Sequence, residues 1–211
     1  MSEILFFGDS ITAPRKNTVV ASELIAEKYP QHRIINKGVP GNDTNLARAR
    51  FENDVLNEKF DVVIFSFGCN DAAIDVFKGK TTPRLALEEY IANLTFFIDE
   101  VRKKGGELIF FTPPPMVMVE KLKQYYGGEP YLSKGFNFML DRFIAAACQL
   151  MTEKGVDVVD VNAIFRQNAS DDEELVKLLP DGMHPNSEGQ RLIFAGLSQA
   201  LEKCPRLTVN Q

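Results

Sequence analysis

Four short polar segments of the sequence contain the residue types that acyl transfer requires. They are Gly8-Asp9-Ser10-Ile11-Thr12, residues 36–44, Gly68-Cys69-Asn70-Asp71 and residues 180–186. Together they supply a serine hydroxyl as nucleophile, a glycine turn that presents backbone N–H groups, a side-chain amide donor and a carboxylate close to a histidine. Each segment is a weak signal alone, but the set points to nucleophilic chemistry on a carbonyl group.

The base for such a reaction must be one of two histidines. A serine hydroxyl is a poor nucleophile until a neighbouring base removes its proton, and histidine suits that task because its ordinary pKa is near neutrality. His32 lies in a polar connector before a strand, at the end of the sheet opposite Ser10. We therefore expect His184 to be the base. Asp181, three residues earlier, is close enough to accept a hydrogen bond from the imidazole and fix its tautomer.

Donors for a negatively charged oxygen are the next requirement, because the carbonyl oxygen gains charge as acyl transfer proceeds. Gly41 lets the backbone approach a ligand closely, and Asn70 offers two N–H donors. Asp9 and Asp71 are expected to fix the turns on which these groups lie, through side-chain bonds to backbone N–H groups.

The elements that must position these segments follow from the hydrophobic pattern. Apolar runs predict strands at residues 4–7, 33–36, 61–67, 107–112 and 156–161. Apolar residues at helical spacing predict helices that end at Gly105 and Gly155 and one over residues 187–203, with weaker signals at residues 17–29 and 44–56. This alternation predicts an α/β fold, a three-layer α/β/α sandwich around a parallel sheet, whose ligands bind at the carboxyl ends of the strands.

The four segments, in this order at four strand ends, resemble the SGNH or GDSL-type family of esterases and acylhydrolases. Gly8-Asp9-Ser10-Ile11 resembles the first block of that family, Gly41 the second, Gly68-Cys69-Asn70-Asp71 the third and Asp181-Gly182-Met183-His184 the last. The resemblance spans residues 8–184. The segment Thr112-Pro113-Pro114-Pro115 is similar to the branch that hydrolyses isoamyl acetate and other small acetate esters.

The resemblance implies a single domain over residues 1–211 with a flavodoxin-like sheet of five parallel strands in the order 2-1-3-4-5. It implies Ser10 as nucleophile, His184 as base and Asp181 as the residue that orients the histidine. The backbone N–H groups of Ser10 and Gly41 and the side-chain amide of Asn70 would form the oxyanion hole.

Other interpretations of the same residues stay open. Ser10 could cap a helix after the first strand, or the turns at Ser10 and Gly41 could hold an anion in a non-catalytic, flavodoxin-like binding module. A P-loop is excluded, because the position five residues before Gly79 holds Ile74. No metal or other cofactor is expected, since the histidines and cysteines lack zinc spacing and no dinucleotide motif follows the first strand. Met and Tyr residues within 116–131 could line the substrate pocket or pack a short surface helix.

The composition limits the partners. Hydrophobic residues make up 45% and charged residues 25%, the balance of a globular protein with a sizeable core. The net charge of −5, from 24 basic and 29 acidic residues, disfavours nucleic acid as a partner. No apolar run is long enough for a membrane helix, and the start of the chain lacks the basic segment of a signal peptide. The three widely spaced cysteines fit reduced thiols, so we expect a cytoplasmic protein.

These observations predict a serine esterase that hydrolyses small, short-acyl carboxylic esters such as acetates through an acyl-enzyme intermediate. Its expected partner is a small-molecule ester. A carbohydrate O-acetylesterase and an acyl-thioesterase with the same triad are alternatives that the sequence does not separate.

Overall fold

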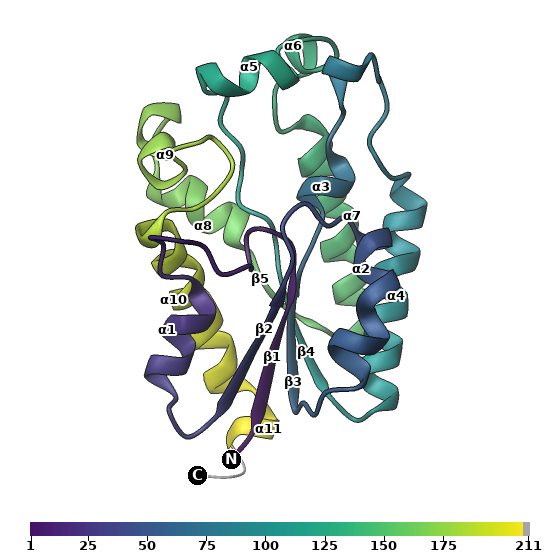
Figure 1. The fold of residues 1–211 in the computed structure, drawn as a ribbon, viewed down its shortest axis with the longest axis vertical. Helices are drawn as coiled ribbons and strands as arrows, with labels where there is room; N and C mark the ends of the chain where they lie inside the picture. The colour runs from purple at the N-terminus through teal and green to yellow at the C-terminus, as the bar shows by residue number, and fades with distance from the viewer. Residues whose placement is uncertain (209–211) are drawn as a thin grey trace.

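A parallel sheet runs through the middle of the computed structural model, which describes residues 1–208 of the chain (Figure 1). Within these residues the sheet has five strands in the spatial order β2-β1-β3-β4-β5. The strands are β1 (Glu3–Gly8), β2 (Arg33–Gly38), β3 (Val62–Ser66), β4 (Glu107–Phe111) and β5 (Asp157–Val159). The predicted fold class and strand order are therefore confirmed.

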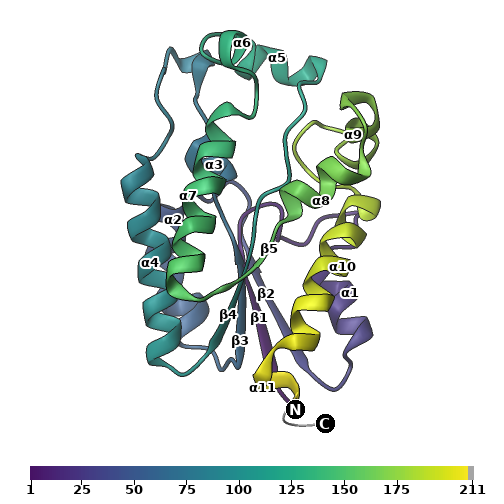
Figure 2. The ribbon, with the colours of Figure 1, turned by 180° about the vertical axis from the view of Figure 1, so that it is seen from behind.

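Helices cover both faces of this sheet, as Figure 1 and the reverse view in Figure 2 show. One face carries α1 (Ala21–Lys28), α8 (Val161–Asn168), α9 (Asp172–Leu178) and α10 (Ser187–Lys203). The other carries α2 (Thr44–Phe51), which continues into a π-helical turn (Glu52–Leu56), α4 (Leu87–Lys103) and α7 (Phe138–Lys154). Beyond the carboxyl ends of the strands lie α3 (Cys69–Ala72), the 3-10 turn Val76–Lys78, α5 (Glu120–Tyr126) and α6 (Tyr131–Lys134). The short α11 (Pro205–Thr208) lies near the amino ends.

The central strands fill two apolar cores because alternate side chains of a strand point to opposite faces. In β1, Leu5 and Phe7 join the core on the α2, α4 and α7 side, whereas Ile4 and Phe6 join the core on the α1, α8 and α10 side. All residues of β3 are buried. This two-sided burial explains why residues 62–65 of β3 are continuously apolar rather than alternating.

Several predicted boundaries differ from the observed ones, and for two of them the local structure shows the reason. The helix expected from residue 17 begins at Ala21, because Asn17 has a φ of +61°, outside the helical region. The apolar run predicts a last strand up to residue 161, but β5 ends at Val159. The carboxylate of Asp160 accepts a hydrogen bond from Ala163 N, which begins α8.

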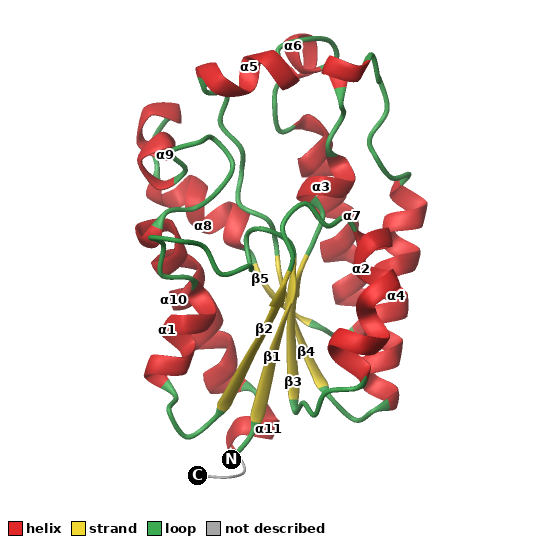
Figure 3. Cartoon of the chain, viewed as in Figure 1, coloured by secondary structure: helices red, strands yellow, loops and turns green. Residues whose placement is uncertain are grey.

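The register of the sheet brings three of the polar segments to one edge. Gly8, the last residue of β1, pairs with Gly38 of β2 and with Ser66 of β3, so the three strands end at the same level. The loops that follow these strands therefore start side by side, and Figure 3 shows them gathered at the carboxyl edge of the sheet. This is the edge at which parallel α/β sheets bind their ligands.

Candidate active site

Ser10 lies in a tight turn directly after β1. The backbone oxygen of Asp9 accepts a hydrogen bond from Thr12 N (3.2 Å), and its Oδ1 accepts one from Ile11 N (2.8 Å). The next helix does not begin until Ala21. The interpretation of Ser10 as a helix cap is therefore wrong, because the turn holds Ser10 at the edge of the sheet without a helix behind it.

Long-range contacts join this turn to the C-terminal part of the chain. The buried side chain of Gln190, in α10, donates from Nε2 to Ile11 O (2.9 Å) and accepts at Oε1 from Ala21 N (2.9 Å). Arg15 donates to the carbonyl oxygen of Pro185. These two contacts thus hold the turn of Ser10 against the segment around His184.

The three predicted triad residues form one hydrogen-bonded chain. Ser10 Oγ lies 2.9 Å from His184 Nε2, and His184 Nδ1 lies 2.8 Å from Asp181 Oδ2. Because the carboxylate can only accept, Nδ1 carries the ring proton of the neutral imidazole. Nε2 is then free to accept the proton of the serine hydroxyl, which is the tautomer that general-base catalysis needs.

Asp181 is kept ionised by the segment in which it lies. Burial raises the pKa of the Asp181 carboxyl, but hydrogen bonds outweigh it and hold the pKa below its ordinary value. The donors are the His184 ring, His184 N (2.7 Å to Oδ1) and Met183 N (3.0 Å to Oδ1). The same carboxylate therefore orients the imidazole and shapes the backbone that carries it.

The backbone N–H groups proposed for the oxyanion hole are available. Gly41 lies in the loop after β2 with a φ of +77°, a conformation that favours glycine. Within residues 1–208, neither Gly41 N nor Ser10 N has a hydrogen-bond partner. Both residues line the same pocket, so the structure brings these two predicted donors together.

Asn70, the third predicted donor, lies in the first turn of α3 and lines that pocket as well. Its Nδ2 donates to Asp9 Oδ2 (3.3 Å) and to Asn42 O (3.1 Å). Burial raises the pKa of Asp9 to about 6, and the bonds from Ile11 N and Asn70 lower it only in part. Asp9 thus links the turn of the serine to the amide of Asn70.

The pocket at these residues is small and mainly apolar apart from the catalytic candidates. It has a volume of about 240 Å³. Its lining residues are Ser10, Ile11, Pro40, Gly41, Cys69, Asn70, Met183 and His184. Burial raises the pKa of the Cys69 thiol to about 12, so this thiol stays protonated and is no competing nucleophile. A larger pocket of about 520 Å³, between β5 and α10, has no serine or histidine in its lining.

A backbone contact fixes the segment that carries Asp181 and His184. Val117 N donates to Gly182 O (2.9 Å), and Gly182 has a φ of +83°. A Cβ at Gly182 would lie 2.3 Å from Val117 O, closer than the two atoms can approach. Glycine is therefore required between the carboxylate and the imidazole. Asn186 ends the segment by accepting from the N–H groups of the first turn of α10.

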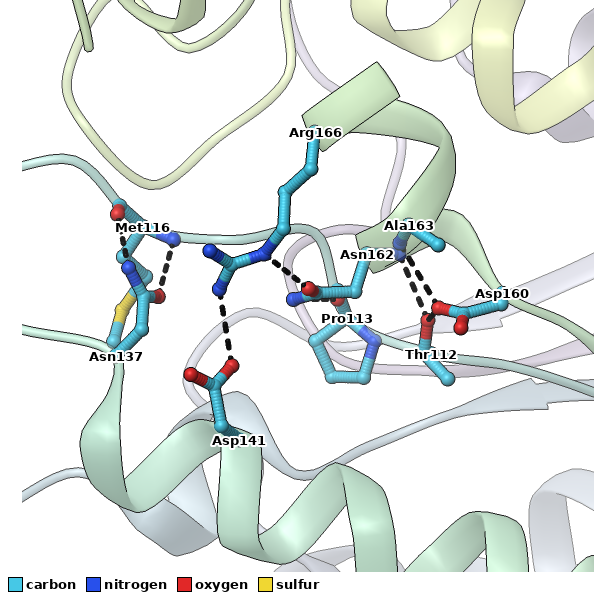
Figure 4. Close-up of polar contacts among 9 residues, drawn as sticks. All are labelled: Thr112, Pro113, Met116, Asn137, Asp141, Asp160, Asn162, Ala163 and Arg166. Carbon is cyan, nitrogen blue, oxygen red and sulfur yellow. Dashed lines mark hydrogen bonds and ion pairs between the residues drawn. The ribbon is translucent and has the colours of Figure 1, made fainter. Parts of the chain in front are cut away.

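The irregular segment after β4 that contains Val117 is held by side chains of α7 and α8 and of the residue that precedes α7 (Figure 4). The side chain of Asn137 donates to Met116 O and accepts from Met116 N, both at 2.7 Å. Asn162 donates from Nδ2 to Pro113 O (3.3 Å) and accepts at Oδ1 from Arg166 (2.7 Å). The side-chain amides of Asn137 and Asn162 therefore bond to the backbone of this segment where it has left the sheet and no longer pairs with a neighbouring strand.

Two further contacts in Figure 4 complete this support. Thr112 Oγ1 donates to Asp160 Oδ1 (3.0 Å), the cap of α8, and Arg166 forms an ion pair of 3.0 Å with Asp141 of α7. The Met and Tyr residues of this region do not line the candidate pocket. They pack with one another or in the core, and they are Met116, Met118, Tyr125, Tyr126 and Tyr131.

One polar residue near the site was not singled out from the sequence. Arg84 donates from Nη1 to Asn70 Oδ1 (3.3 Å), although it belongs to no motif and only its three-dimensional contacts reveal it. His32, by contrast, accepts from Ser2 N (3.2 Å) at the amino end of the sheet, as expected. In the described part of the chain, no group of three His, Cys, Asp or Glu side chains could hold a metal ion.

Comparison with known sequences assigns most of the chain to one family. The profile of the GDSL-like Lipase/Acylhydrolase family matches residues 6–192. The chain is 27% identical to the isoamyl acetate-hydrolyzing esterase 1 homolog of Rattus norvegicus, over 95% of this chain and 81% of that protein. It is 42% identical to the lipoprotein YqeF of Bacillus subtilis over 84 residues, which are 40% of this chain and only 33% of that protein.

Comparison with solved structures agrees on the fold. The crystal structure of the lipase/acylhydrolase from Enterococcus faecalis superimposes with a TM-score of 0.76 at 23% identity, covering 96% of both chains. Among residues 1–208, no helix combines the length and the apolar character that crossing a bilayer requires.

Because the family profile matches residues 6–192, the chain belongs to the GDSL-like lipase/acylhydrolase family, a family of carboxylic ester hydrolases.

Proposed function

We propose that the chain hydrolyses small, short-acyl carboxylic esters, with Ser10 as nucleophile, His184 as base and Asp181 as the residue that orients the imidazole. The observation that carries the proposal is the unbroken hydrogen-bonded chain from Asp181 through His184 to Ser10 at the mouth of a small pocket. A binding module would have no use for this arrangement, because an imidazole held between a carboxylate and a hydroxyl serves proton transfer.

The reaction has two matching halves. Ser10 Oγ attacks the carbonyl carbon of the ester while His184 Nε2 takes the hydroxyl proton. The bond from that carbon to the leaving oxygen then breaks, and His184 returns the proton to the departing alcohol, which leaves an acyl group on Ser10. Water, deprotonated by His184, attacks the acyl carbon, and the proton passes back to Ser10 Oγ as the acid departs.

Charge on the carbonyl oxygen is greatest in the two tetrahedral intermediates. Three donors can receive it: the backbone N–H groups of Ser10 and Gly41 and the Nδ2 amide of Asn70, which line one pocket. The turns already hold Ser10 N and Gly41 N in place, so little reorganisation accompanies the charging of the oxygen there. Asn70 Nδ2 must exchange its longer hydrogen bond, to Asp9 Oδ2 (3.3 Å), for one to the charged oxygen while it keeps the bond to Asn42 O (3.1 Å). We assign the oxyanion hole to these three groups.

The size of the pocket supports a short acyl group. Its volume of about 240 Å³ is below the range typical of pockets for larger ligands. Ile11, Pro40 and Met183 supply apolar walls around the serine. The relative from Rattus norvegicus is named for the hydrolysis of isoamyl acetate, an acetate ester. We therefore expect kcat/KM to be highest for acetyl to butyryl esters and lower by eight acyl carbons.

A panel of substrates tests this proposal. Initial rates would be measured with p-nitrophenyl esters of two to twelve acyl carbons, with acetylated sugars and with acyl-CoA thioesters. Ser10→Ala should abolish turnover of every active substrate, whereas Ser170→Ala, at an exposed serine outside the pocket, should not. Activity should survive chelators, since no step uses a metal.

A maximum at ten or more carbons would contradict the short-acyl proposal. A clear preference for acetylated sugars or for thioesters would keep the triad and change the substrate class. The cytoplasmic location expected from the sequence stays a prediction.

A further inference from the structure

The amide of Asn70 can serve an oxyanion hole in only one of its two orientations. Nδ2 donates hydrogen bonds and Oδ1 accepts them, yet the two ends have nearly the same size, so packing does not distinguish them. A rotation of the amide by about 180° would exchange donor and acceptor. Hydrogen bonds around the amide must therefore select the orientation that the proposed reaction needs.

Three contacts select it, and two of them lie on the donor side. Asn70 Nδ2 faces two oxygens, Asp9 Oδ2 at 3.3 Å and Asn42 O at 3.1 Å. On the acceptor side, Oδ1 receives a hydrogen bond from Arg84 Nη1 at 3.3 Å. A reversed amide would place its oxygen against both oxygens and its NH₂ group against the guanidinium, so every contact would become repulsive.

Arg84 is in turn held in place by its own neighbours. Its Nε and Nη2 donate to Asp75 Oδ1 at 3.1 and 2.8 Å, and its backbone N donates to Ala73 O at 2.9 Å. Leu85 N donates to Asp71 O (3.2 Å), which closes the loop between α3 and α4 at its base. The guanidinium fork therefore reaches Asn70 from a fixed position, although 32% of its side-chain surface is exposed.

We propose that Arg84, anchored by Asp75, is a positioning residue that fixes the amide of Asn70 in its donating orientation and strengthens its N–H groups as donors. The inference rests on the proposed function, because it assumes that Asn70 contacts the oxyanion. A cation bound at Oδ1 draws electron density from the amide, so the N–H bonds become more polar. The effect is largest when the carbonyl oxygen is charged, which places it in kcat rather than in KM.

The test is a double-mutant cycle on kcat and KM with p-nitrophenyl acetate. Arg84→Met keeps the length of the side chain and removes the fork, and Lys78→Met is the matched control. Lys78 also pairs with Asp75 (3.2 Å) but has no hydrogen bond to Asn70. We expect Arg84→Met to lower kcat by about 10-fold with little change in KM, a smaller loss than the factor of about 10²–10³ for removal of a whole oxyanion donor. Lys78→Met should behave as wild type.

The decisive comparison is made in the Asn70→Ala background. There Arg84→Met should cause no further loss of kcat, because the amide that it positions is absent. A loss of the same size in both backgrounds would overturn the proposal. So would a raised KM with an unchanged kcat, which would instead assign Arg84 to substrate binding in the neighbouring polar pocket that it lines with Asp43 and Lys80.

Two further variants protect the test against a folding defect. Asp75→Asn leaves the guanidinium in place but weakens its anchor, and Arg84→Lys keeps the charge without the fork. Both should lower kcat less than Arg84→Met, at an unchanged melting temperature. If all folded variants keep the wild-type kcat while Asn70→Ala loses activity, the role of Arg84 is refuted and the proposed function stands. If Asn70→Ala itself keeps full activity, the assignment of Asn70 to the oxyanion hole fails first.

Discussion

At the scale of single residues, two substitutions of Asn70 distinguish a catalytic role of its side chain from a structural one. Asn70→Ala should lower kcat by about 10²–10³ with little change in KM, the usual loss for one oxyanion donor. Asn70→Asp should be nearly inactive yet folded, because the introduced carboxylate repels the developing oxyanion and lies beside Asp9. Steady-state kinetics together with circular dichroism would check both. Wild-type kcat in folded Asn70→Asp enzyme would remove Asn70 from the mechanism.

The next residue, Asp71, has a buried carboxyl group that should make the stability of the protein depend on pH. Its Oδ1 accepts from Thr44 N (2.8 Å) and Thr44 Oγ1 (2.5 Å), but its buried Oδ2 has no partner within residues 1–208. Burial raises the pKa of Asp71 to about 7, and the bonds from Thr44 oppose that rise only in part. The folded protein therefore binds this proton more tightly than the unfolded chain, so the contribution of Asp71 to stability falls as pH rises towards and through about 7.

Asp71→Asn should remove this component of the pH dependence. Urea unfolding between about pH 5 and about pH 8 would give the free energy of unfolding of the variant and of the wild type. The wild type should lose more stability over that interval than Asp71→Asn does. Asp172→Asn, at an exposed position of α9, is the control and should follow the wild type. If the free energy of unfolding changes equally with pH in Asp71→Asn and in the wild type, Asp71 is ionised in the folded protein throughout this pH interval.

At the scale of elements, the contact between the segment after β4 and the Asp181–His184 segment predicts a positional defect. Gly182→Ala adds a Cβ that meets Val117 O at 2.3 Å and Leu122 Cδ1 at 2.7 Å. The backbone must shift, and the imidazole shifts with it, so kcat should fall by more than the loss of stability explains. Gly155→Ala is the matched control, since Gly155 also has a positive φ (+59°) but open space around its Cβ position.

Both glycine variants should lose about 1 kcal/mol or more of stability, because alanine tolerates a positive φ poorly. Kinetics and thermal melting of the two proteins would separate stability from position. Full activity of folded Gly182→Ala would show that the backbone contact does not set the place of His184. An equal loss of kcat in Gly155→Ala would show that the loss comes from alanine at a positive φ in general and not from the contact of Gly182 with Val117.

The elements themselves show what the sequence can and cannot predict. Long apolar runs and helical spacing located all five strands and the helices α4, α7 and α10 closely, because burial on both faces leaves a strong local pattern. The helices α8 and α9 were not predicted, because each has only about two turns and therefore leaves a short pattern in the sequence, even though each begins at an aspartate cap. The late start of α1 depends partly on the bond from Val19 N to Ser187 Oγ, a contact across the chain.

The candidate site likewise contains residues that a local sequence pattern predicts and one residue that it does not. Ser10, Gly41, Asn70 and His184 lie in motifs with fixed local spacing and line one pocket. Asp181, from the same motif as His184, does not line the pocket but forms a hydrogen bond with the imidazole. Arg84 carries no such signal, because its partners Asn70 and Asp75 are reached only through the fold of a polar loop.

At the scale of the whole molecule, the site joins the two ends of the chain. Ser10 and His184 are 174 residues apart, and they meet because β1 lies inside the sheet, between β2 and β3, while α10 packs beside α1. The serine is thus presented by the first strand and its base by a segment that precedes the last long helix. An intact sheet is a condition for the triad, so its reactivity reports on the whole fold.

Labelling with an organophosphonate tests the central claim most directly. Such a compound reacts with a serine hydroxyl only where a neighbouring base and an oxyanion hole activate it. Intact-protein and peptide mass spectrometry should show a single adduct, located on Ser10, with loss of esterase activity in step with labelling. His184→Ala should label much more slowly. Absence of an adduct under conditions that inactivate a control serine esterase, or an adduct on any other serine, would contradict the assignment of Ser10 as the nucleophile.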